Sequence, residues 1–409
     1  FPNSRNIPKL RFLKFNDEWK NKKLGDLMNF KVTNSYSRDN LNYESGTVKN
    51  VHYGDIHTKF QTLFDLGKEN VPYINEDILL NRISEDFYCQ EGDIIFADAS
   101  EDLNDVGKSI EITNLNGEKL LSGLHTLLAR PQKNNFSKGF LGYLLKSDFV
   151  RNQIKREAQG SKVLSINVGR ISNIHLSFPS LSEQQKISEF LSILDKRILC
   201  SMKIIEGLIT QKNFIIKKLF KQNLSDLNTI LLSDFLKIPN KVKPNIIDKE
   251  KLLTVKLHLK GVHKNENSDS LSLGATNYFI RKKGQFIYGK QNLFNGAFAI
   301  IPDKYDGFLS SADVPALDIN ENIVNAKYLF YFFSRESFYK KLEDIASGSG
   351  SKRIHENTLL NLKITIPSLA IQNKVARFLS KFDEKINIEN ELLTQYENQK
   401  KYLLQNLFV

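Results

Sequence analysis

The chain has 409 residues, enough for two or three domains at about 150 residues each, and its net charge of +12 favours a polyanionic partner. The two cysteines, Cys89 and Cys200, lie far apart without a CxxC pattern, which excludes a disulfide scaffold and a zinc module and indicates the cytoplasm. No apolar run approaches the roughly 18 residues of a membrane span, so we expect no membrane partner.

The first part of the chain indicates a compact domain of strands with one helix. Strand-like runs occupy residues 47–52, 93–97, 109–113 and 125–129, and a helix is predicted over residues 140–157. A last strand is predicted where Ile174, Leu176 and Phe178 alternate with polar residues. The small residues Gly160 and Ser161 lie just upstream and are expected to expose backbone N–H groups.

A long helix is predicted directly after Pro179, where Ser180 and Glu183 have the spacing of a capping box. Its apolar residues are separated alternately by four and three positions, a period typical of a coiled-coil seam. A helix of about 40 residues would be roughly 60 Å long at 1.5 Å per residue.

The rest of the chain repeats this order of elements. Strand-like runs occupy residues 252–259, 285–288, 297–301 and 314–319, followed by a predicted helix over residues 328–344. Small residues at positions 348–351 precede a strand in which Leu362, Ile364 and Ile366 alternate. A second long helix is predicted from there to the end of the chain.

An internal repeat carries most of the information about architecture. The segment that begins at Gly160 aligns without a gap with the segment that begins at Gly348, and each matching pair is 188 positions apart. Pro179 matches Pro367, Gln184 matches Gln372, and the register persists to Phe220 and Phe408, among other pairs. An alignment that keeps one register over some sixty residues is not expected by chance, so the chain contains two copies of one unit.

The two long helices are predicted to pair through their shared seam. Polar residues interrupt the seam at the same two places, Ser201 and Lys212 in one helix and Glu389 and Lys400 in the other. Two ordinary core helices are the alternative interpretation. The predicted apolar seam residues are Ile187, Leu191, Leu194, Ile198, Ile205, Leu208, Ile215 and Leu219, with Val375, Leu379, Phe382, Ile386, Leu393, Tyr396, Leu403 and Leu407.

Motifs of catalysis and metal binding are mostly missing. Gly107, Lys108 and Ser109 resemble the end of a P-loop, but its first glycine is replaced by Asp102. An EF-hand that would begin at Asp98 lacks its glycine and its last glutamate. The sequence has no HExxH, no GxSxG and no Asn-Pro-Pro-aromatic motif, so we predict a non-catalytic protein without catalytic, metal or cofactor-binding residues.

The remaining features suit DNA binding. Residues 237–290 hold twelve Lys or Arg against four Asp or Glu, which could neutralise phosphates while polar side chains reach base edges. Residues 49–59 mix Lys, His, Tyr and Asn in a way that fits base readout. The alternative interpretation of any run of lysines is a solvent-exposed surface that has no role in DNA binding. His125 and His175 lie in apolar alternation and are interpreted as core or rim residues.

Two variable domains, each followed by a similar long helix, closely resemble the specificity subunits of type I restriction–modification enzymes. The resemblance rests on the paired GS segments, on the Pro-Ser-Leu-x-x-Gln-x-Lys junctions at Pro179 and Pro367, and on the segments at residues 7–27, 91–112 and 123–131. It implies an α/β (α+β) fold with two globular target recognition domains separated by two long antiparallel coiled-coil helices, with internal two-fold pseudosymmetry. The implied domains are residues 1–180, 181–222, 223–368 and 369–409.

The resemblance also implies function and partners. Each recognition domain would read one half of a split site on double-stranded DNA, and the helices would act as a spacer and bind two methyltransferase subunits. S-adenosylmethionine, ATP and Mg would be bound by partner subunits, which include restriction and translocase subunits in the full complex. A DNA-modifying enzyme with degenerate motifs and a purely structural coiled-coil adaptor are the alternatives.

The candidate DNA-binding residues were chosen as polar loop and strand-end positions. In the first domain they are Lys49, His52, Tyr53, His57, Lys59, Ser161 and Lys162. In the second domain they are Lys256, His258, Lys260, Arg281, Lys282, Lys283, Ser351, Lys352 and Arg353.

Overall fold

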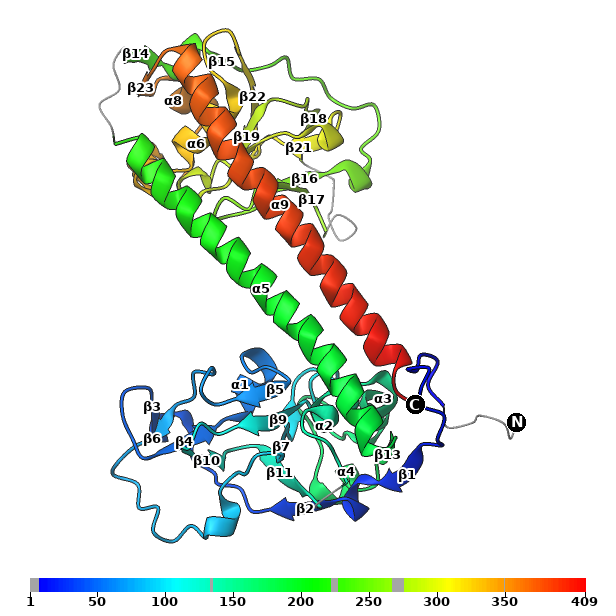
Figure 1. Cartoon of the computed structure of the whole chain (residues 1–409). Coiled ribbons are helices and arrows are strands. Elements are labelled where there is room, and N and C mark those ends of the chain that lie inside the picture. The colour runs from blue at the N-terminus through cyan, green and yellow to red at the C-terminus, as the bar shows by residue number, and fades with distance from the viewer. Residues whose placement is uncertain (1–6, 133–134, 222–226, 267–275, 349) are drawn as a thin grey trace. The chain divides into compact units, whose positions relative to one another are not determined.

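The structure is a computed structural model that describes residues 7–132, 135–221, 227–266, 276–348 and 350–409. Its longest elements are two helices, α5 (Leu181–Leu219) and α9 (Leu369–Asn406), which Figure 1 shows as unbroken rods. The chain forms two compact units. The first unit is Phe1–Met202 with Glu391–Val409, and the second unit is Lys203–Asn390, so each unit contains one end of each long helix.

The first unit contains two principal sheets. The five-stranded sheet has the order β2-β11-β7-β9-β5, in which only β5 and β9 are parallel. Its strands are β2 (Met28–Lys31), β5 (Leu63–Asp65), β7 (Ile94–Ala97), β9 (Ser109–Asn114) and β11 (Thr126–Pro131). The four-stranded sheet has the order β10-β4-β6-β3, with β3 (Leu41–Asn42), β4 (Val48–Val51), β6 (Tyr73–Ile74) and β10 (Lys119–Ser122). The four strands predicted in this domain are confirmed as β4, β7, β9 and β11.

The sheets of the second unit have fewer and shorter strands. A four-stranded sheet has the order β15-β22-β19-β20, built from β15 (Leu236–Lys237), β19 (Phe286–Tyr288), β20 (Phe298–Ile300) and β22 (Ala316–Ile319). Two strand pairs accompany it, β16 (Leu253–Val255) with β17 (Val262–Lys264), and β18 (Tyr278–Ile280) with β21 (Leu309–Ser311). The strand predicted over residues 252–259 is too long, because His258 and Leu259 adopt φ angles of 57° and 59°, which a strand cannot accommodate.

The single helix predicted in each domain is wrong, because both are interrupted at equivalent positions. In the first unit the segment forms α2 (Phe140–Leu144) and α3 (Asp148–Glu157), with the side chain of Ser147 accepting a hydrogen bond from Val150 N. In the second unit it forms α6 (Ala326–Phe333), α7 (Glu336–Tyr339) and the 3-10 helix η8 (Lys340–Ile345). Ser147 and Arg335, 188 positions apart, are both extended N-cap residues that start a new helix.

Each long helix follows a strand that closes its own domain. β13 (His175–Phe178) pairs antiparallel with β1 (Lys20–Lys23), and β23 (Lys363–Ile366) pairs in the same way with β14 (Asn228–Leu231). The last strands that the alternation predicts are therefore confirmed. Shorter elements include α1 (Tyr53–Thr58), β8 (Ala99–Ser100), β12 (Leu164–Ser165), α4 (Val168–Ile171) and α8 (Glu356–Leu360), together with several 3-10 helices.

The predicted capping box at the start of α5 is wrong. The hydroxyl of Ser180 lies 3.2 Å from the hydroxyl of Ser182 instead of capping the helix through its side chain. The carboxylate of Glu183 accepts two hydrogen bonds of 2.8 Å from the guanidinium of Arg11. Because Glu183 is almost fully buried, its charge is compensated by this ion pair and is not available for the cap.

Candidate DNA interface and helix pair

The seam residues predicted from the heptad pattern lie on the covered sides of the two helices. All sixteen of them are buried or half-buried, as are the polar seam residues Ser201, Lys212, Glu389 and Lys400. In the first unit, Leu191 and Leu194 of α5 belong to the same buried cluster as Leu403 and Leu407 of α9. Burial of one apolar stripe per helix is the packing that a 3.5-residue period requires.

The helix segments run antiparallel within each unit. In the first unit Asp195 forms an ion pair with Lys400, and Arg197 donates a 3.4 Å hydrogen bond to the hydroxyl of Tyr396. Residue numbers therefore increase along α5 in the direction in which they decrease along α9. In the second unit Lys212 pairs with Asp383, while Ile216 packs in one cluster with Leu379. The two ion pairs are copies of each other, because Asp195 matches Asp383 and Lys212 matches Lys400 at the repeat offset of 188.

A glutamine of the junction motif fixes each helix to its recognition domain. The Gln184 carbonyl accepts a 2.9 Å hydrogen bond from Ser137 N, and its amide donates one of 2.9 Å to the carbonyl of Pro179. Gln372 accepts from Asn325 N at 3.0 Å and donates to the carbonyl of Pro367 at 2.9 Å. Both glutamine side chains are buried, so the repeated motif specifies a repeated anchor.

The domain boundaries taken from the sequence remain predictions. α5 begins at Leu181 and α9 at Leu369, but the compact units divide within the helices, not at their ends. The predicted boundary between residues 222 and 223 lies outside the described residues.

Three first-domain candidates for DNA binding are held by contacts within the domain. Lys49 lies on β4, largely covered, and its ammonium is 2.8 Å from the carboxylate of Glu118. Lys59 is more exposed, and its ammonium is 2.9 Å from Asp55. His52 is buried, and its ring nitrogen Nδ1 accepts a hydrogen bond from Gly54 N at the start of α1. Burial lowers the pKa of His52, and its role as the N-cap residue of α1 favours a structural function, while its assignment as a DNA contact stays a prediction.

The structure gathers the other first-domain candidates around an aromatic and histidine cluster. The ring of Tyr53 lies 5.9 Å from His57 and 5.3 Å from His125, measured between ring centroids. His57 Nε2 is 3.0 Å from the carbonyl of Ala99 on β8, and β8 pairs with β12, the strand that follows the exposed residues Ser161 and Lys162. The pairing of β8 with β12 therefore connects the cluster of Tyr53, His57 and His125 with the segment that carries Ser161 and Lys162.

His125 also belongs to this cluster, although the sequence pattern does not mark it as a DNA-binding candidate. Its side chain is 53% exposed, and Nδ1 lies 3.2 Å from the carboxylate of Asp98. Its φ angle is 54°, an unusual conformation for a residue other than glycine. The sequence predicts that His125 and His175 are core or rim residues, and both are exposed, so the core alternative is wrong and the rim alternative agrees with the structure. A histidine directly after Gly123 and Leu124 is the available signal for a turn at His125.

Arg281 is a structural residue in the second domain. It is 4% exposed, its Nε donates a 2.6 Å hydrogen bond to the hydroxyl of Ser310, and its guanidinium stacks on Phe279 at 5.5 Å. Burial lowers the pKa of Arg281 to about 10, so the group stays charged at neutral pH. The donors of Arg281 face the interior of the domain, which favours a structural role, and its assignment to DNA binding stays a prediction.

The other second-domain candidates lie at the surface, but several have acidic partners. The ion pairs join Lys256 with Glu266 at 3.4 Å, Lys283 with Asp303 at 3.6 Å, Lys352 with Glu343 at 2.7 Å and Arg353 with Asp313 at 3.2 Å. His258, Lys260, Lys282 and Ser351 are exposed. The excess charge of residues 237–290 is therefore partly compensated locally, and the exposed pairs among these are worth little to stability.

The part of the chain that the structure describes offers no cluster of three or more His, Cys, Asp or Glu side chains suited to a metal ion. In the same residues, no helix combines the length and the apolar character that crossing a membrane requires. Both cysteines are free thiols, Cys89 buried and Cys200 exposed.

Relatives with this organisation are known. The chain is 24% identical over 427 residues to the putative type I restriction enzyme MjaX specificity subunit of Methanocaldococcus jannaschii, covering 99% of this chain and 96% of the relative. It is 26% identical over 307 residues to the type I restriction enzyme MjaVIII specificity subunit of the same organism, covering 68% of this chain and 71% of the relative.

Solved structures share the fold. The S subunit of the type I restriction–modification system from M. genitalium matches with a TM-score of 0.61 and 16% identity over 98% of this chain and 99% of that one. A chain from a study of complex assembly and conformational transition of the type I restriction–modification system matches with a TM-score of 0.53 and 13% identity, covering 95% of this chain and 97% of that one. These likenesses confirm the predicted fold class. The family model for the type I restriction modification DNA specificity domain matches residues 16–209 and 225–398, so the chain belongs to the family of type I restriction–modification specificity subunits.

Proposed function

We propose that each recognition domain reads one half of a bipartite DNA target while the two long helices set the distance between the halves. The observation that carries this proposal is the contrast between repeated anchors and different surfaces. Gln184 and Gln372 make the same contacts, and so do the ion pairs Asp195–Lys400 and Lys212–Asp383. A pair of repeated helix anchors that carries two recognition domains with different surfaces suits the recognition of two different half-sites.

The candidate reading surfaces differ in chemistry. The first domain offers Tyr53, His125 and Asp98 beside the exposed residues Ser161 and Lys162. A carboxylate accepts hydrogen bonds from cytosine or adenine amino groups, and a histidine can donate to purine acceptors. The second domain offers His258, Lys260, Lys282 and Ser351 instead, a set that is rich in donors. We infer that the second domain depends more on phosphate and acceptor groups than the first.

Catalysis is assigned to partner subunits in this proposal. Two methyltransferase subunits would dock on the helix pair, binding S-adenosylmethionine and methylating the DNA that the chain selects. Restriction and translocase subunits would use ATP and Mg in the full complex. The family match to a DNA specificity domain supports this division of labour, and a DNA-reading subunit would act in the cytoplasm.

The exposed apolar residues of the helices support the docking role. Within the first unit these include Phe190, Ile193 and Met202 of α5, and within the second unit Phe214 of α5 and Phe378 of α9. Large apolar side chains on the outer faces of long helices are typical of protein-binding surfaces.

A domain exchange tests the proposal. Residues 227–364 are replaced by the matching domain of a relative, and the methylated sites of a host that carries the whole system are mapped by methylome sequencing. The expected result is one changed half-site and one unchanged half-site at the original spacing. A change in both halves contradicts separate reading, and methyl transfer by the purified chain without partners contradicts the assignment of catalysis to other subunits.

A further inference from the structure

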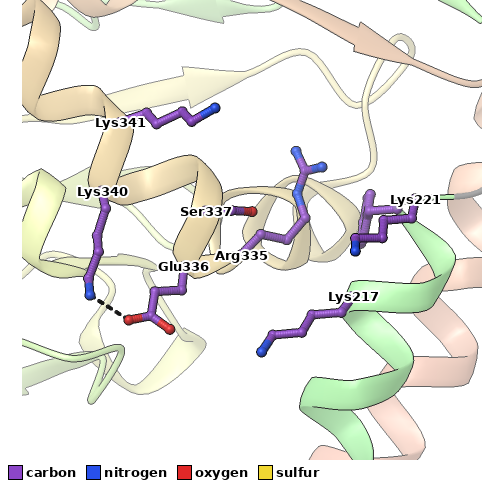
Figure 2. A pocket seen from close by; sticks show the side chains of 8 residues that line it. Lys217, Lys221, Arg335, Glu336, Ser337, Lys340 and Lys341 are labelled. Carbon is purple, nitrogen blue, oxygen red and sulfur yellow. Dashed lines mark ion pairs between the residues drawn. The ribbon is translucent and has the colours of Figure 1, made fainter.

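A cavity of about 610 Å³ opens in the second unit where the end of α5 meets α7 and η8. Figure 2 shows its side chains approaching from two sides. Lys217 lies on α5 and Lys221 just after the end of that helix, and they face the helical segment that starts at Arg335. Its lining, called the basic cavity below, consists of Lys217, Phe220, Lys221, Arg335, Glu336, Ser337, Lys340 and Lys341.

The charge of the basic cavity is strongly unbalanced. Five of its eight lining residues are lysine or arginine, and Glu336 is its single carboxylate. Lys340 is 2.6 Å from that carboxylate. Among the described residues, no acidic side chain forms an ion pair with Lys217, Lys221, Lys341 or Arg335. Within this part of the chain, Glu336 is the single carboxylate of the lining and is paired with Lys340, so the cavity keeps an excess of positive charge. Such a concentration of like charge favours a polyanionic ligand.

Arg335 is held in place by aromatic side chains. Its guanidinium carbon lies 3.9 Å from the ring centroid of Phe332, 4.7 Å from that of Phe220 and 5.2 Å from that of Phe338. Its Nε donates a 2.9 Å hydrogen bond to the carbonyl of Phe332. These contacts fix the plane of the guanidinium, and the terminal N–H groups are left to bind an oxyanion in a forked geometry.

The packing of the helix end does not require these charges. At the repeat offset of 188, Phe220 matches Phe408, so the aromatic contact with the recognition domain is kept. The cations have neutral counterparts: Lys217 matches Gln405, Lys221 matches Val409, Arg335 matches Ser147, Lys340 matches Asn152 and Lys341 matches Gln153. The basic character therefore belongs to the second half of the chain alone and has a cause other than folding of the junction.

We propose that the basic cavity binds backbone phosphates of the DNA strand that leaves the second half-site, a contact that rests on the proposed DNA-reading function. Lysine is depleted in protein–protein interfaces, yet it supplies four of the eight lining residues here, which favours nucleic acid over a protein partner. Lysine, arginine and serine hydroxyl groups are the usual donors to phosphate oxygens. The contact adds affinity without adding sequence preference.

The test compares two double variants of the full chain assembled with its methyltransferase subunits. Lys217→Gln/Lys221→Gln removes two cations of the cavity, and Lys203→Gln/Lys218→Gln removes two exposed lysines of the same helix that do not line it. Binding to a duplex with the target identified by methylome sequencing, and to a scrambled duplex, is measured by fluorescence anisotropy over a range of salt concentrations. For the cavity variant we expect the slope of log affinity against log salt to fall by about two units, with an unchanged target preference. The control variant keeps the wild-type slope.

A second measurement locates the contact on the DNA. Single phosphates in the duplex next to the second half-site are replaced by neutral methylphosphonates. Neutral phosphates at the contact weaken binding of the wild type and leave the cavity variant unaffected. An equal response of the two proteins overturns the inference, as does a cavity variant that keeps its salt slope but loses its methyltransferase subunits, which would indicate a protein ligand. If the wild type itself shows no target preference, the proposed function fails instead.

Discussion

Tyr143 donates a 2.8 Å hydrogen bond from its buried hydroxyl to the same carboxylate of Asp195 that pairs with Lys400. One residue of the recognition domain is thereby linked to both long helices within the first unit. Tyr331 makes the equivalent 2.5 Å hydrogen bond to Asp383, the partner of Lys212, in the second unit. Each recognition domain is thus joined to the helix pair by a tyrosine, a carboxylate and an ammonium group.

The coupling between Asp195 and Lys400 is expected to stabilise the first unit. Both side chains are about one-fifth exposed, so Asp195→Ala leaves an ammonium that is poorly solvated and should lower the free energy of unfolding by about 1–3 kcal/mol. A double-mutant cycle with Lys400→Ala, followed by urea denaturation, measures the coupling. The same cycle on Lys212 and Asp383 serves as an internal replicate. Additive single effects in both cycles would contradict the coupling.

Shortening both helices is expected to shorten the spacer between the half-sites. Removing residues 198–204 with residues 386–392 deletes one heptad from each helix and keeps the register of both ion pairs. Each helix loses roughly 10 Å at 1.5 Å per residue, equivalent to about three base pairs. Methylome sequencing should therefore find both half-sites retained with a shorter gap. Methylation of the original spacing alone, by a variant that still assembles, would contradict the role of the helices as a ruler.

Neighbouring basic residues of the second domain are expected to act differently. Lys282 and Lys283 are exposed, so Lys282→Gln/Lys283→Gln should lower the salt slope of DNA binding by up to about two units without changing stability. Arg281→Ala should destabilise the domain by about 2 kcal/mol or more, since it removes buried hydrogen bonds and the contact with Phe279. Thermal unfolding and anisotropy titrations separate the effects. An unchanged salt slope for the double variant would leave Lys282 and Lys283 as a solvated face.

Lys146 is expected to make stability depend on pH. Burial, with Lys400 and Lys108 as like charges, lowers its pKa from 10.5 to about 7, and its ammonium donates a 2.6 Å hydrogen bond to Thr62. Between these two pKa values the unfolded chain binds more protons than the folded chain, so the contribution of Lys146 to the free energy of unfolding rises with pH.

The matched variants are Lys146→Met and Lys162→Met, the second at an exposed lysine. From pH 7 to pH 9 the stability of the wild type should rise by up to about 2 kcal/mol more than that of Lys146→Met, as measured by urea denaturation. Lys162→Met should follow the wild type. The same pH dependence in wild type and Lys146→Met would show that Lys146 keeps an ordinary pKa.

The sequence by itself determined the two long helices, the equivalent junctions before them and the strands that lead into them. The heptad period predicts the two long helices because their structure is local and their seam repeats every seven residues. The offset of 188 predicts equivalent junctions, and Gln184 and Gln372 bear this out with the same contacts. Alternation predicts β13 and β23 for the same reason, since a strand with one buried face has a period of two residues.

Only the tertiary structure decided which polar residues are available to a ligand. Arg281 looks like a surface cation in the sequence, but the fold brings Ser310 and the carbonyl of Val314 to its guanidinium, and it is buried. The basic cavity needs Lys217 and Arg335, more than one hundred positions apart, to face each other across the end of α5. Burial and charge clustering depend on contacts between distant parts of the chain, and no local period encodes them.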